Sequence, residues 1–593
     1  MYLINSFFPI IFFLAIYYSG RNLDKIFFFN YKKNLIFYYT LIFLIIAIIL
    51  NILFFFNIDK KIIVKVIFYF FLFLLILNLT NLISDLKIFF KLSKQNINKS
   101  FFILLIALFL VYIALIVLPT TDPDSLDYHL GAPSKWLIAD SFLPYYYWLN
   151  YRLVGFGEFL IYFGLVLNIE NFGSSIQLLY ILLFYFFLKE NKVFSKSAID
   201  QNLIYLSLFS MPIILSLLMT QKFFLAPTLI ISSIIINIYL NYKSFNKLEF
   251  FLIISSLYFC LLTKLNFLFY FILINMYFLK YINNKYFNKF IIYNIILLLI
   301  VSPFYYRNFI FYGDPISPFL EFIKKNPESS LVNFSNYVRS YESNLDNIFS
   351  FFLSILKTFI PIGYNSLTTF AGIFLFYFFM PKSEKKEKIY FYIGILTFIL
   401  QLLIGQFSSR YLLISIIFLS IYFMINIKKN KFFTIIIICQ TLLVIIFSSY
   451  PVLYFIFDNK NYLKNFAYEY DETKWLNNNI KNEKYISDIR SVYYLNDNHI
   501  IFFNYFANSS QSNEMQNNKL KEFIIENKIL YASFKTFNES KYMSSYEYIN
   551  KCFDVIDKQS FTIQTRKPIF LRQLDSNNLN RFILKRKIKN VEC

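Results

Sequence analysis

Long apolar runs constrain this chain more than any other feature. The sequence repeatedly runs about 16 to 22 residues without a charge, and 58% of its 593 residues are hydrophobic. A helix of roughly 20 apolar residues crosses a bilayer core, because each residue adds about 1.5 Å along the axis. The runs therefore predict an all-α polytopic membrane protein. The first run, residues 2–19, lacks a preceding basic segment and a small-residue cleavage site, so we interpret it as a retained helix.

Clustered lysines predict which loops face the cytoplasm. The positive-inside rule assigns short lysine-rich loops to that side, and connecting them requires about 14 crossings with both termini outside. The crossings are expected at residues 2–19, 36–57, 61–83, 101–119, 174–189, 203–219, 223–241, 249–263, 265–280, 290–306, 365–380, 388–404, 411–427 and 431–450. Two further segments, 153–168 and 347–362, would break the alternation and contain Glu158 and Lys357, so we expect them to be re-entrant or interfacial. The same loops account for most of the net charge of +22, so we expect no nucleic-acid partner.

One predicted outer loop is unusually rich in polar and rare residues. Residues 122–173 hold one of two histidines, two of three tryptophans and five of eleven glycines. Asp122 followed by Pro123 is typical of a helix N-cap with proline at the first helical position, which predicts a helix to about Ala139. Residues Tyr145–Trp148 could stack on a ligand or form an interfacial aromatic belt, and the belt is the interpretation we favour.

The polar residues of this predicted loop helix have functional and structural interpretations. Asp124, Asp127 and Tyr128 are spaced to share one helix face. In the structural interpretation, the negative charge of Asp124 only stabilises the N-terminus of the helix, and Asp127 is a solvated surface charge. His129 could be a hydrogen-bonded packing residue. An Asp-x-Asp with a nearby histidine is also compatible with a metal site, but the sequence does not show the remaining ligands.

Arginine is rare and does not follow the lysines. Up to residue 458 there are five arginines, and four fall in predicted outer segments: Arg152, Arg307, Arg339 and Arg410. The planar guanidinium suits bidentate recognition of phosphate or carboxylate, so the set suggests an anionic lipid headgroup. The alternative is that these side chains extend to the interface or pair with acidic residues.

Three groups of residues resemble motifs of the GT-C fold membrane glycosyltransferases, which use polyprenyl-phosphate sugars, as the dolichyl-phosphate-mannose-protein mannosyltransferases do. They are Asp124-Ser-Leu-Asp-Tyr-His-Leu130 with Ala132-Pro-Ser-Lys-Trp136 and Phe156-Gly-Glu-Phe159, then Pro303-Phe-Tyr-Tyr-Arg-Asn308 with Gly313-Asp-Pro-Ile-Ser-Pro318, and Ser408-Ser-Arg-Tyr-Leu412. The resemblance covers roughly residues 100–450. Ser125 and Phe304 depart from it, where the motifs have alanine and tryptophan.

The resemblance implies a GT-C-like domain over residues 1–458, with a first catalytic outer loop at 120–152 and a second outer loop at 307–346. It implies inverting transfer of a sugar from a polyprenyl-phosphate carrier to a lipid, glycan or protein acceptor, on the outer face of the cytoplasmic membrane. Asp124, Asp127 and His129 are then the expected catalytic residues. The expected substrate-binding residues are Arg307, Arg410, Tyr411, Lys264, Glu158 and Tyr128. No cofactor is required, although a divalent cation could take part.

Residues 459–593 differ in character from the rest of the chain. Apolar runs stop, and short alternating stretches such as Ile500–Phe503 and Ile529–Ala532 flank polar helical stretches such as Asn518–Asn527. We predict a small soluble extracytoplasmic α/β domain without catalytic residues, in which His499 occupies a turn. Cys552 and Cys593 show no metal-ligand spacing.

Two other function classes remain open at this stage. A transporter or flippase of lipid-linked glycans would also need many spans and outer arginines, but commonly shows repeat symmetry and acidic residues within its spans. A non-catalytic protein with the same fold would not need Asp124. Transfer of label from a polyprenyl-phosphate sugar by the purified protein would distinguish them.

Overall fold

The computed structural model describes most of the chain: residues 7–27, 31–92, 99–241, 245–281, 284–339, 356, 359, 370–372, 377, 387–404, 409–428, 430–481, 483–496, 499–501, 513–535, 547–564 and 576–587. The chain forms two compact units. Unit 1 comprises Met1–Pro119, Gly155–Val301 and Tyr341–Ile456, and unit 2 comprises Thr120–Val154, Ser302–Ser340 and Phe457–Cys593. Three segments that are far apart in the sequence therefore build unit 2.

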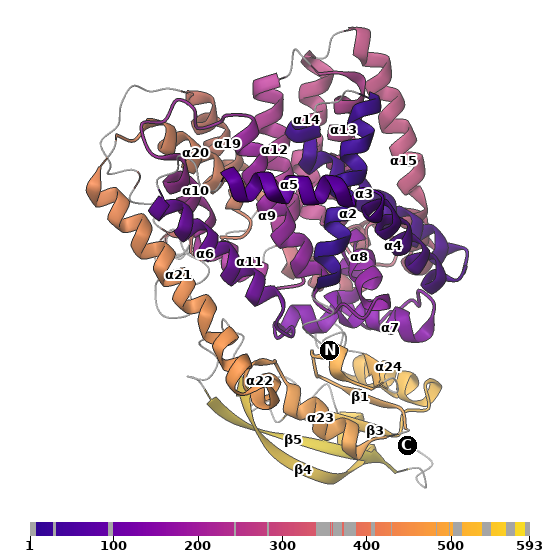
Figure 1. Ribbon diagram of the computed structural model, residues 1–593. Helices are drawn as coiled ribbons and strands as arrows, with labels where there is room; N and C mark the ends of the chain where they lie inside the picture. The colour runs from indigo at the N-terminus through magenta and orange to yellow at the C-terminus, as the bar shows by residue number, and fades with distance from the viewer. Residues whose placement is uncertain are drawn as a thin grey trace. The chain divides into compact units, whose positions relative to one another are not determined.

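Unit 1 is helical throughout its described residues (Figure 1). Helix α3 (Tyr31–Phe55) contacts α8 (Phe156–Val166), α9 (Phe172–Glu190) and α13 (Lys247–Thr263), and so forms the centre of this unit. The other helices are α2 (Phe7–Phe27), α4 (Lys60–Ile76), α5 (Leu79–Leu92), α6 (Lys99–Ile116), α10 (Gln201–Phe209), α11 (Pro212–Leu218), α12 (Leu225–Asn241), α14 (Leu268–Tyr281), α19 (Lys388–Ile404) and α20 (Leu413–Asn426). Helices α15 (Asn284–Tyr312) and α21 (Lys431–Phe457) continue beyond it into unit 2.

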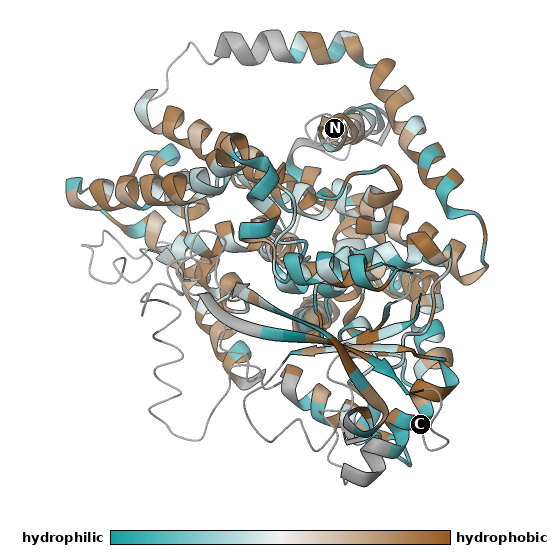
Figure 2. Cartoon of the chain, turned by 90° about the horizontal axis from the view of Figure 1, so that it is seen from below, coloured by the Kyte–Doolittle hydropathy of each residue, from teal (hydrophilic) through white to brown (hydrophobic). Residues whose placement is uncertain are grey.

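Four helices of the described part are long and apolar enough to cross a membrane. Their qualifying stretches are Lys33–Phe55, Phe172–Glu190, Phe287–Tyr312 and Lys431–Phe457. Only 22% of the apolar window on α15 and 33% of that on α21 is buried, so these helices expose broad hydrophobic faces. Soluble monomers rarely expose such surfaces, and Figure 2 shows long brown, hydrophobic stretches on many of the helices. The chain is therefore built as a membrane protein.

The predicted number of about 14 crossings is not supported. Helices do occupy every predicted crossing except 365–380, which lies almost entirely outside the described residues. Several of them have only 10–17 residues, too short for a straight helix across the hydrocarbon core. Two bent pairs, α4 with α5 at 63° and α10 with α11 at 57°, raise the number of candidate spans among the described residues to six at most. Apolar runs located the helices, but their lengths and bends limit how many can cross.

Of the two segments expected to be re-entrant or interfacial, the structure describes only one in full. Segment 153–168 contains α8, an almost fully buried helix of 11 residues, which is too short to cross a bilayer alone. Gly155 is the N-cap residue of this helix, and the backbone of α13 leaves no room for a side chain there: a Cβ would lie 2.5 Å from the Leu262 carbonyl oxygen. Segment 347–362, including Lys357, lies outside the described residues apart from 356 and 359.

Unit 2 contains a five-stranded sheet, as the alternating pattern of its last segment predicts. The strand order is β2 (His499–Ile501), β1 (Tyr485–Ser487), β3 (Tyr531–Lys535), β5 (Ser576–Arg586) and β4 (Phe553–Gln564). Strand β1 runs parallel to β2 and β3, whereas β5 is antiparallel to β3 and β4. The helices of this segment are α22 (Asn459–Phe466), α23 (Tyr470–Asn479), α24 (Asn513–Glu526) and α25 (Glu547–Cys552).

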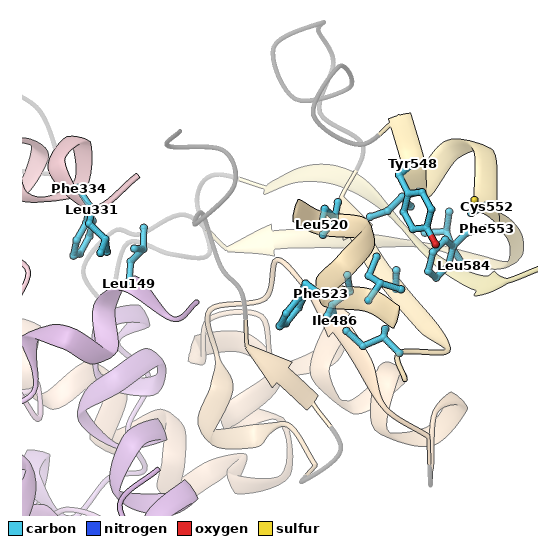
Figure 3. Close-up of a cluster of buried hydrophobic side chains, with 14 residues drawn as sticks. Leu149, Leu331, Phe334, Ile486, Leu520, Phe523, Tyr548, Cys552, Phe553 and Leu584 are labelled. Carbon is cyan, nitrogen blue, oxygen red and sulfur yellow. The ribbon is translucent and has the colours of Figure 1, made fainter. Parts of the chain in front are cut away.

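One apolar core joins the three segments of unit 2 (Figure 3). Leu149 comes from the first segment, and Leu331 and Phe334 come from helix α16 (Ser329–Arg339) of the second. They cluster with Leu520 and Phe523 of α24, and further members come from the sheet. Because all three segments bury side chains in this core, the loop at 120–154 folds together with the C-terminal segment.

Candidate functional site

The acidic loop, residues 120–154, begins with a capped helix, and the cap is Asp122. Its carboxylate accepts hydrogen bonds from the Ser125 amide and hydroxyl, both at 2.9 Å. The helix starts at Pro123, passes through a π-helical turn over Ser125–His129 (η1) and continues as α7 (Gly131–Ala139). The prediction of a capped helix from Pro123 to Ala139 is confirmed, with an additional π-turn. Such turns are rare and often occur at functional sites.

Asp124 and Asp127 meet on one guanidinium group, that of Arg490. Arg490 Nη2 donates to Asp124 Oδ1 at 2.7 Å, and Nε donates to Asp127 Oδ2 at 3.2 Å. The Asp124 side chain is 32% exposed, whereas those of Asp127 and Arg490 are 1% and 9% exposed. A substrate could therefore reach Asp124 but not Asp127 in this conformation.

Asp127 is held by three donors. Besides Arg490, Trp148 Nε1 donates to Oδ1 at 2.8 Å and Asn150 Nδ2 donates to Oδ2 at 2.6 Å. Burial raises the pKa of Asp127 to about 6, although Arg490 and the Trp148 and Asn150 hydrogen bonds oppose this shift. The carboxylate is thus ionised at neutral pH but fully engaged, which fits positioning better than direct proton transfer.

The main chain at Arg490 is fixed by a second carboxylate. Glu469 Oε2 accepts the amide hydrogens of Arg490 at 2.7 Å and Ser491 at 3.3 Å, and Lys535 Nζ pairs with Glu469 Oε1 at 2.6 Å. Burial acts to raise the pKa of Glu469, but Lys535 and Arg581 outweigh it and hold this pKa below its ordinary value. Burial also acts to lower the pKa of Arg490, but Asp124 and Asp127 outweigh it and raise that pKa. Both side chains are therefore charged.

The ion pairs extend into the sheet. Arg581 on β5 pairs through Nε with Glu472 at 2.5 Å and through Nη1 with Asp488 at 2.7 Å. Lys535 lies 3.6 Å from Glu472, which links this group to Glu469. At Glu472 burial dominates, so its pKa is raised despite the nearby cations. A continuous set of buried charges thus connects the sheet to the acidic loop.

The neighbouring His129 and Tyr128 are buried rather than exposed. Their ring centroids lie 4.0 Å apart, and the His129 side chain has no exposed surface. A direct catalytic role for His129 would require the loop to open. Trp148 is also buried and donates to Asp127, so the predicted aromatic belt does not include it.

The second motif packs against the loop at residues 120–154 within unit 2. The guanidinium carbon of Arg307 on α15 lies 3.6 Å from the ring centroid of Phe142, and Phe311 stacks on Phe142 at 6.0 Å. Arg152 Nη1 donates to Ser317 Oγ at 2.9 Å and its guanidinium covers the Tyr312 ring at 4.3 Å. The second motif therefore contacts residues 142 and 152 of the loop that carries the first motif.

The Gly313–Pro318 motif forms a compact turn. Gly313 adopts φ +62°, a left-handed conformation that glycine reaches without strain. Asp314 then accepts the amide hydrogens of Ile316 at 2.9 Å and Leu320 at 3.1 Å. Asp314 thus has a structural role in shaping this turn. Arg339, the remaining outer arginine of unit 2, has a side chain outside the described positions.

The other predicted substrate-binding residues belong to unit 1. Glu158 Oε2 accepts the Gly155 amide hydrogen at 2.6 Å and so caps α8, which is a structural role. Lys264 directly follows the last residue of α13. Arg410 lies 4.8 Å from the ring centroid of Tyr411, which packs against Phe224. Arg410 and Tyr411 are both half-buried.

The C-terminal segment contributes contacts that sequence reasoning missed and contradicts one prediction. Arg490 pairs with Asp124 and Asp127, and Glu469 accepts the amide hydrogen of Arg490. The sequence around Arg490 could not reveal this role, because both of its partners lie more than 360 residues away along the chain. His499 begins β2 instead of occupying a turn, and its Nε2 lies 2.9 Å from Ser487 Oγ. Among the described residues, no group of three or more His, Cys, Asp or Glu side chains is arranged to hold a metal ion.

Comparison with known families places most of the chain in one of them. The family described as the DUF1420 N-terminal domain matches residues 12–461. The chain belongs to this family. The matched part includes the acidic loop and the 303–318 motif, whereas Arg490 lies beyond its end. The DUF1420 family has no assigned function. No curated protein and no solved structure matches the chain.

Proposed function

We propose that this protein is an inverting glycosyltransferase that moves a sugar from a polyprenyl-phosphate carrier to an acceptor at the outer face of the cytoplasmic membrane. The observation that carries the proposal is the contact between the loop at residues 120–154, which contains Asp124, and the Pro303–Pro318 motif within unit 2. A half-exposed carboxylate and a buried arginine thus belong to the same unit.

Asp124 is the general base in this proposal. Its carboxylate takes the proton of the acceptor hydroxyl, whose oxygen attacks the anomeric carbon of the sugar. The bond between that carbon and the phosphate oxygen breaks, and the polyprenyl phosphate leaves with the electron pair, which inverts the configuration. A positioned base contributes about 10²- to 10⁴-fold to such a step. Asp127, buried beside it, orients the loop helix.

Arg307, which lies in the same unit as Asp124, is the proposed partner of the carrier phosphate. Negative charge grows on the leaving phosphate, and fixed cations stabilise it most where water is scarce. Arg307 is buried against the Phe142 ring, so the phosphate would reach its guanidinium only when this ring moves aside. Arg410, Lys264 and Tyr411 belong to unit 1 and stay predictions of the sequence as phosphate ligands, as does a divalent cation.

The outer side of the membrane is proposed for unit 2. Lysine-rich loops favour it, and a disulfide at Cys552 supports it because disulfides persist in oxidising compartments. Polyprenyl-phosphate sugars also serve as donors where nucleotide sugars are absent. The expected location is thus a multi-pass protein of the cytoplasmic membrane with its active site outside.

The test is transfer of label from polyprenyl-phosphate sugars by the purified protein in detergent or nanodiscs. Asp124→Asn keeps the side-chain shape but removes the proton acceptor, so we expect transfer to fall by at least about 10²-fold with unchanged expression. Asp122→Asn is the matched control, since asparagine also caps helices well, and it should retain most activity. Near-normal turnover by Asp124→Asn would reject the base.

A wild-type protein that transfers no label from any such donor would argue against the enzyme as a whole. Movement of a lipid-linked glycan across proteoliposomes without transfer would then favour the flippase alternative. The absence of both transfer and movement would favour a non-catalytic role.

A further inference from the structure

We propose that Arg490 is the positioning residue of the candidate site, so that residues 457–593 are a part of the site and not an accessory domain. The inference rests on the proposed function, because it assigns a role to Arg490 through Asp124. It goes beyond the family match, which ends at residue 461.

The geometry of Arg490 suits this role. A guanidinium is planar and presents donors in fixed directions, so one group can orient two carboxylates at once. Nε engages Asp127 at 3.2 Å and Nη2 engages Asp124 at 2.7 Å. Arg490 is almost fully buried, so solvent screens these pairs only weakly. Rotation of Asp124 is therefore restricted, although its side chain stays partly exposed.

Arg490 is itself fixed from the other side. Glu469 has φ +55°, a left-handed conformation that costs free energy for a residue with a side chain. Its carboxylate accepts the amide hydrogens of Arg490 and Ser491 and pairs with Lys535. The segment thus holds the Arg490 backbone as well as presenting its side chain. An ordinary ion pair on the surface has no such support for its backbone.

The proposed consequence is that Arg490 favours the ionised form of Asp124 and fixes the direction of its carboxylate. A general base must be ionised before it can accept a proton, and a fixed cation beside it favours that form. When Asp124 takes the hydroxyl proton, its attraction to Arg490 weakens, and Arg490 remains paired with Asp127. Arg490 touches no reacting atom in this scheme and acts only through the carboxylates.

The experiment compares Arg490→Lys, Arg490→Gln and the control Lys587→Gln in the full-length protein. Lys587 pairs with Asp554 at 3.0 Å, but both side chains are exposed, so this pair should matter little. We expect Arg490→Gln to lower transfer at pH 7 by about 10²-fold or more and to move the acidic limb of the rate–pH profile to higher pH. Arg490→Lys, which keeps the charge but not the fork, should be intermediate, and Lys587→Gln should match the wild type. A normal rate with an unmoved acidic limb in Arg490→Gln would overturn the role.

Thermal unfolding provides a second readout that needs no activity. Arg490→Gln leaves the buried charge of Asp127 poorly compensated, so the melting temperature should fall. Adding Asp127→Asn removes that charge and should restore part of the loss, whereas Lys587→Gln should show no such coupling. Purely additive effects of Arg490→Gln and Asp127→Asn would contradict the pairing. If the wild type transfers no sugar, the glycosyltransferase proposal fails, and this coupling still decides whether Arg490 holds the carboxylates.

Discussion

Asp124 and Asp127 are three residues apart and share one cation, yet their surroundings assign them different chemistry. Asp124 is partly exposed and can meet a substrate. Asp127 is enclosed by Trp148, Asn150 and Arg490, and burial raises its pKa to about 6. Two carboxylates with separate environments can take separate roles, so the exposed one is the candidate base and the buried one is the anchor.

At the same scale, Asp127 predicts a pH dependence of stability. An unfolded aspartate has a pKa of about 3.9, so between about pH 4 and pH 6 the unfolded chain is ionised at this position while the folded chain still holds the proton. The folded state therefore binds more protons, and the contribution of Asp127 to stability falls as pH rises through this window. Thermal unfolding of the wild type and Asp127→Asn should show the wild type losing stability relative to the variant from pH 4 to pH 6. A constant difference, or one of opposite sign, would contradict the raised pKa.

At the scale of single elements, two short helices show how local packing departs from simple periodicity. The π-turn at Ser125–His129 inserts one extra residue per turn before α7, which changes the directions of the following side chains. Helix α8 begins at a glycine and is capped by Glu158 from within. Both features adapt a helix to its neighbours.

Gly155→Ala should therefore destabilise the protein. Its Cβ would lie 2.5 Å from the Leu262 oxygen and 2.8 Å from the Thr263 oxygen, and these are backbone atoms that cannot rotate away. Overpacking of this kind typically costs about 1 to 3 kcal/mol. The melting temperature in detergent should fall more than for Glu158→Gln, which retains an acceptor for the Gly155 amide. An unchanged melting temperature for Gly155→Ala would show that α8 can move away from α13.

For the whole molecule, the main feature is that unit 2 combines three distant segments around one core. Its cysteine content also bears on the compartment. Cys260 and Cys439 are free, whereas Cys552 is disulfide-bonded. This disulfide and the lysine distribution both favour the proposed outer side for unit 2.

Topology can be tested by cysteine labelling in spheroplasts. Ser134→Cys and Lys528→Cys in unit 2 should react with an impermeant maleimide in intact spheroplasts, because we expect this unit outside. Ser195→Cys, in a predicted cytoplasmic loop, should react only after lysis. Cys439 is exposed and would be replaced by serine in all variants. Labelling of Ser195→Cys but not of the unit 2 positions would invert the map.

Several features could be predicted from the sequence because they depend on neighbouring residues. Apolar runs located the helices, Asp122-Pro123 marked the start of the loop helix, and alternation after residue 458 indicated a sheet. Caps and periodicity act within a few residues. The number of membrane-crossing helices was not predictable in this way, since bends and short helices decide it.

Only the tertiary structure could decide which side chains share the site with Asp124. The contact of Arg490 joins residues 366 apart in the sequence, and the burial of Asp127 arises from Trp148, Asn150 and Arg490 together. Burial and ion pairing depend on which distant segments share a core, and local patterns carry no information about that choice. The sequence by itself thus determined the membrane helices, the acidic loop and the soluble segment, whereas packing among the three segments of unit 2 decided the partners and exposure of the carboxylates.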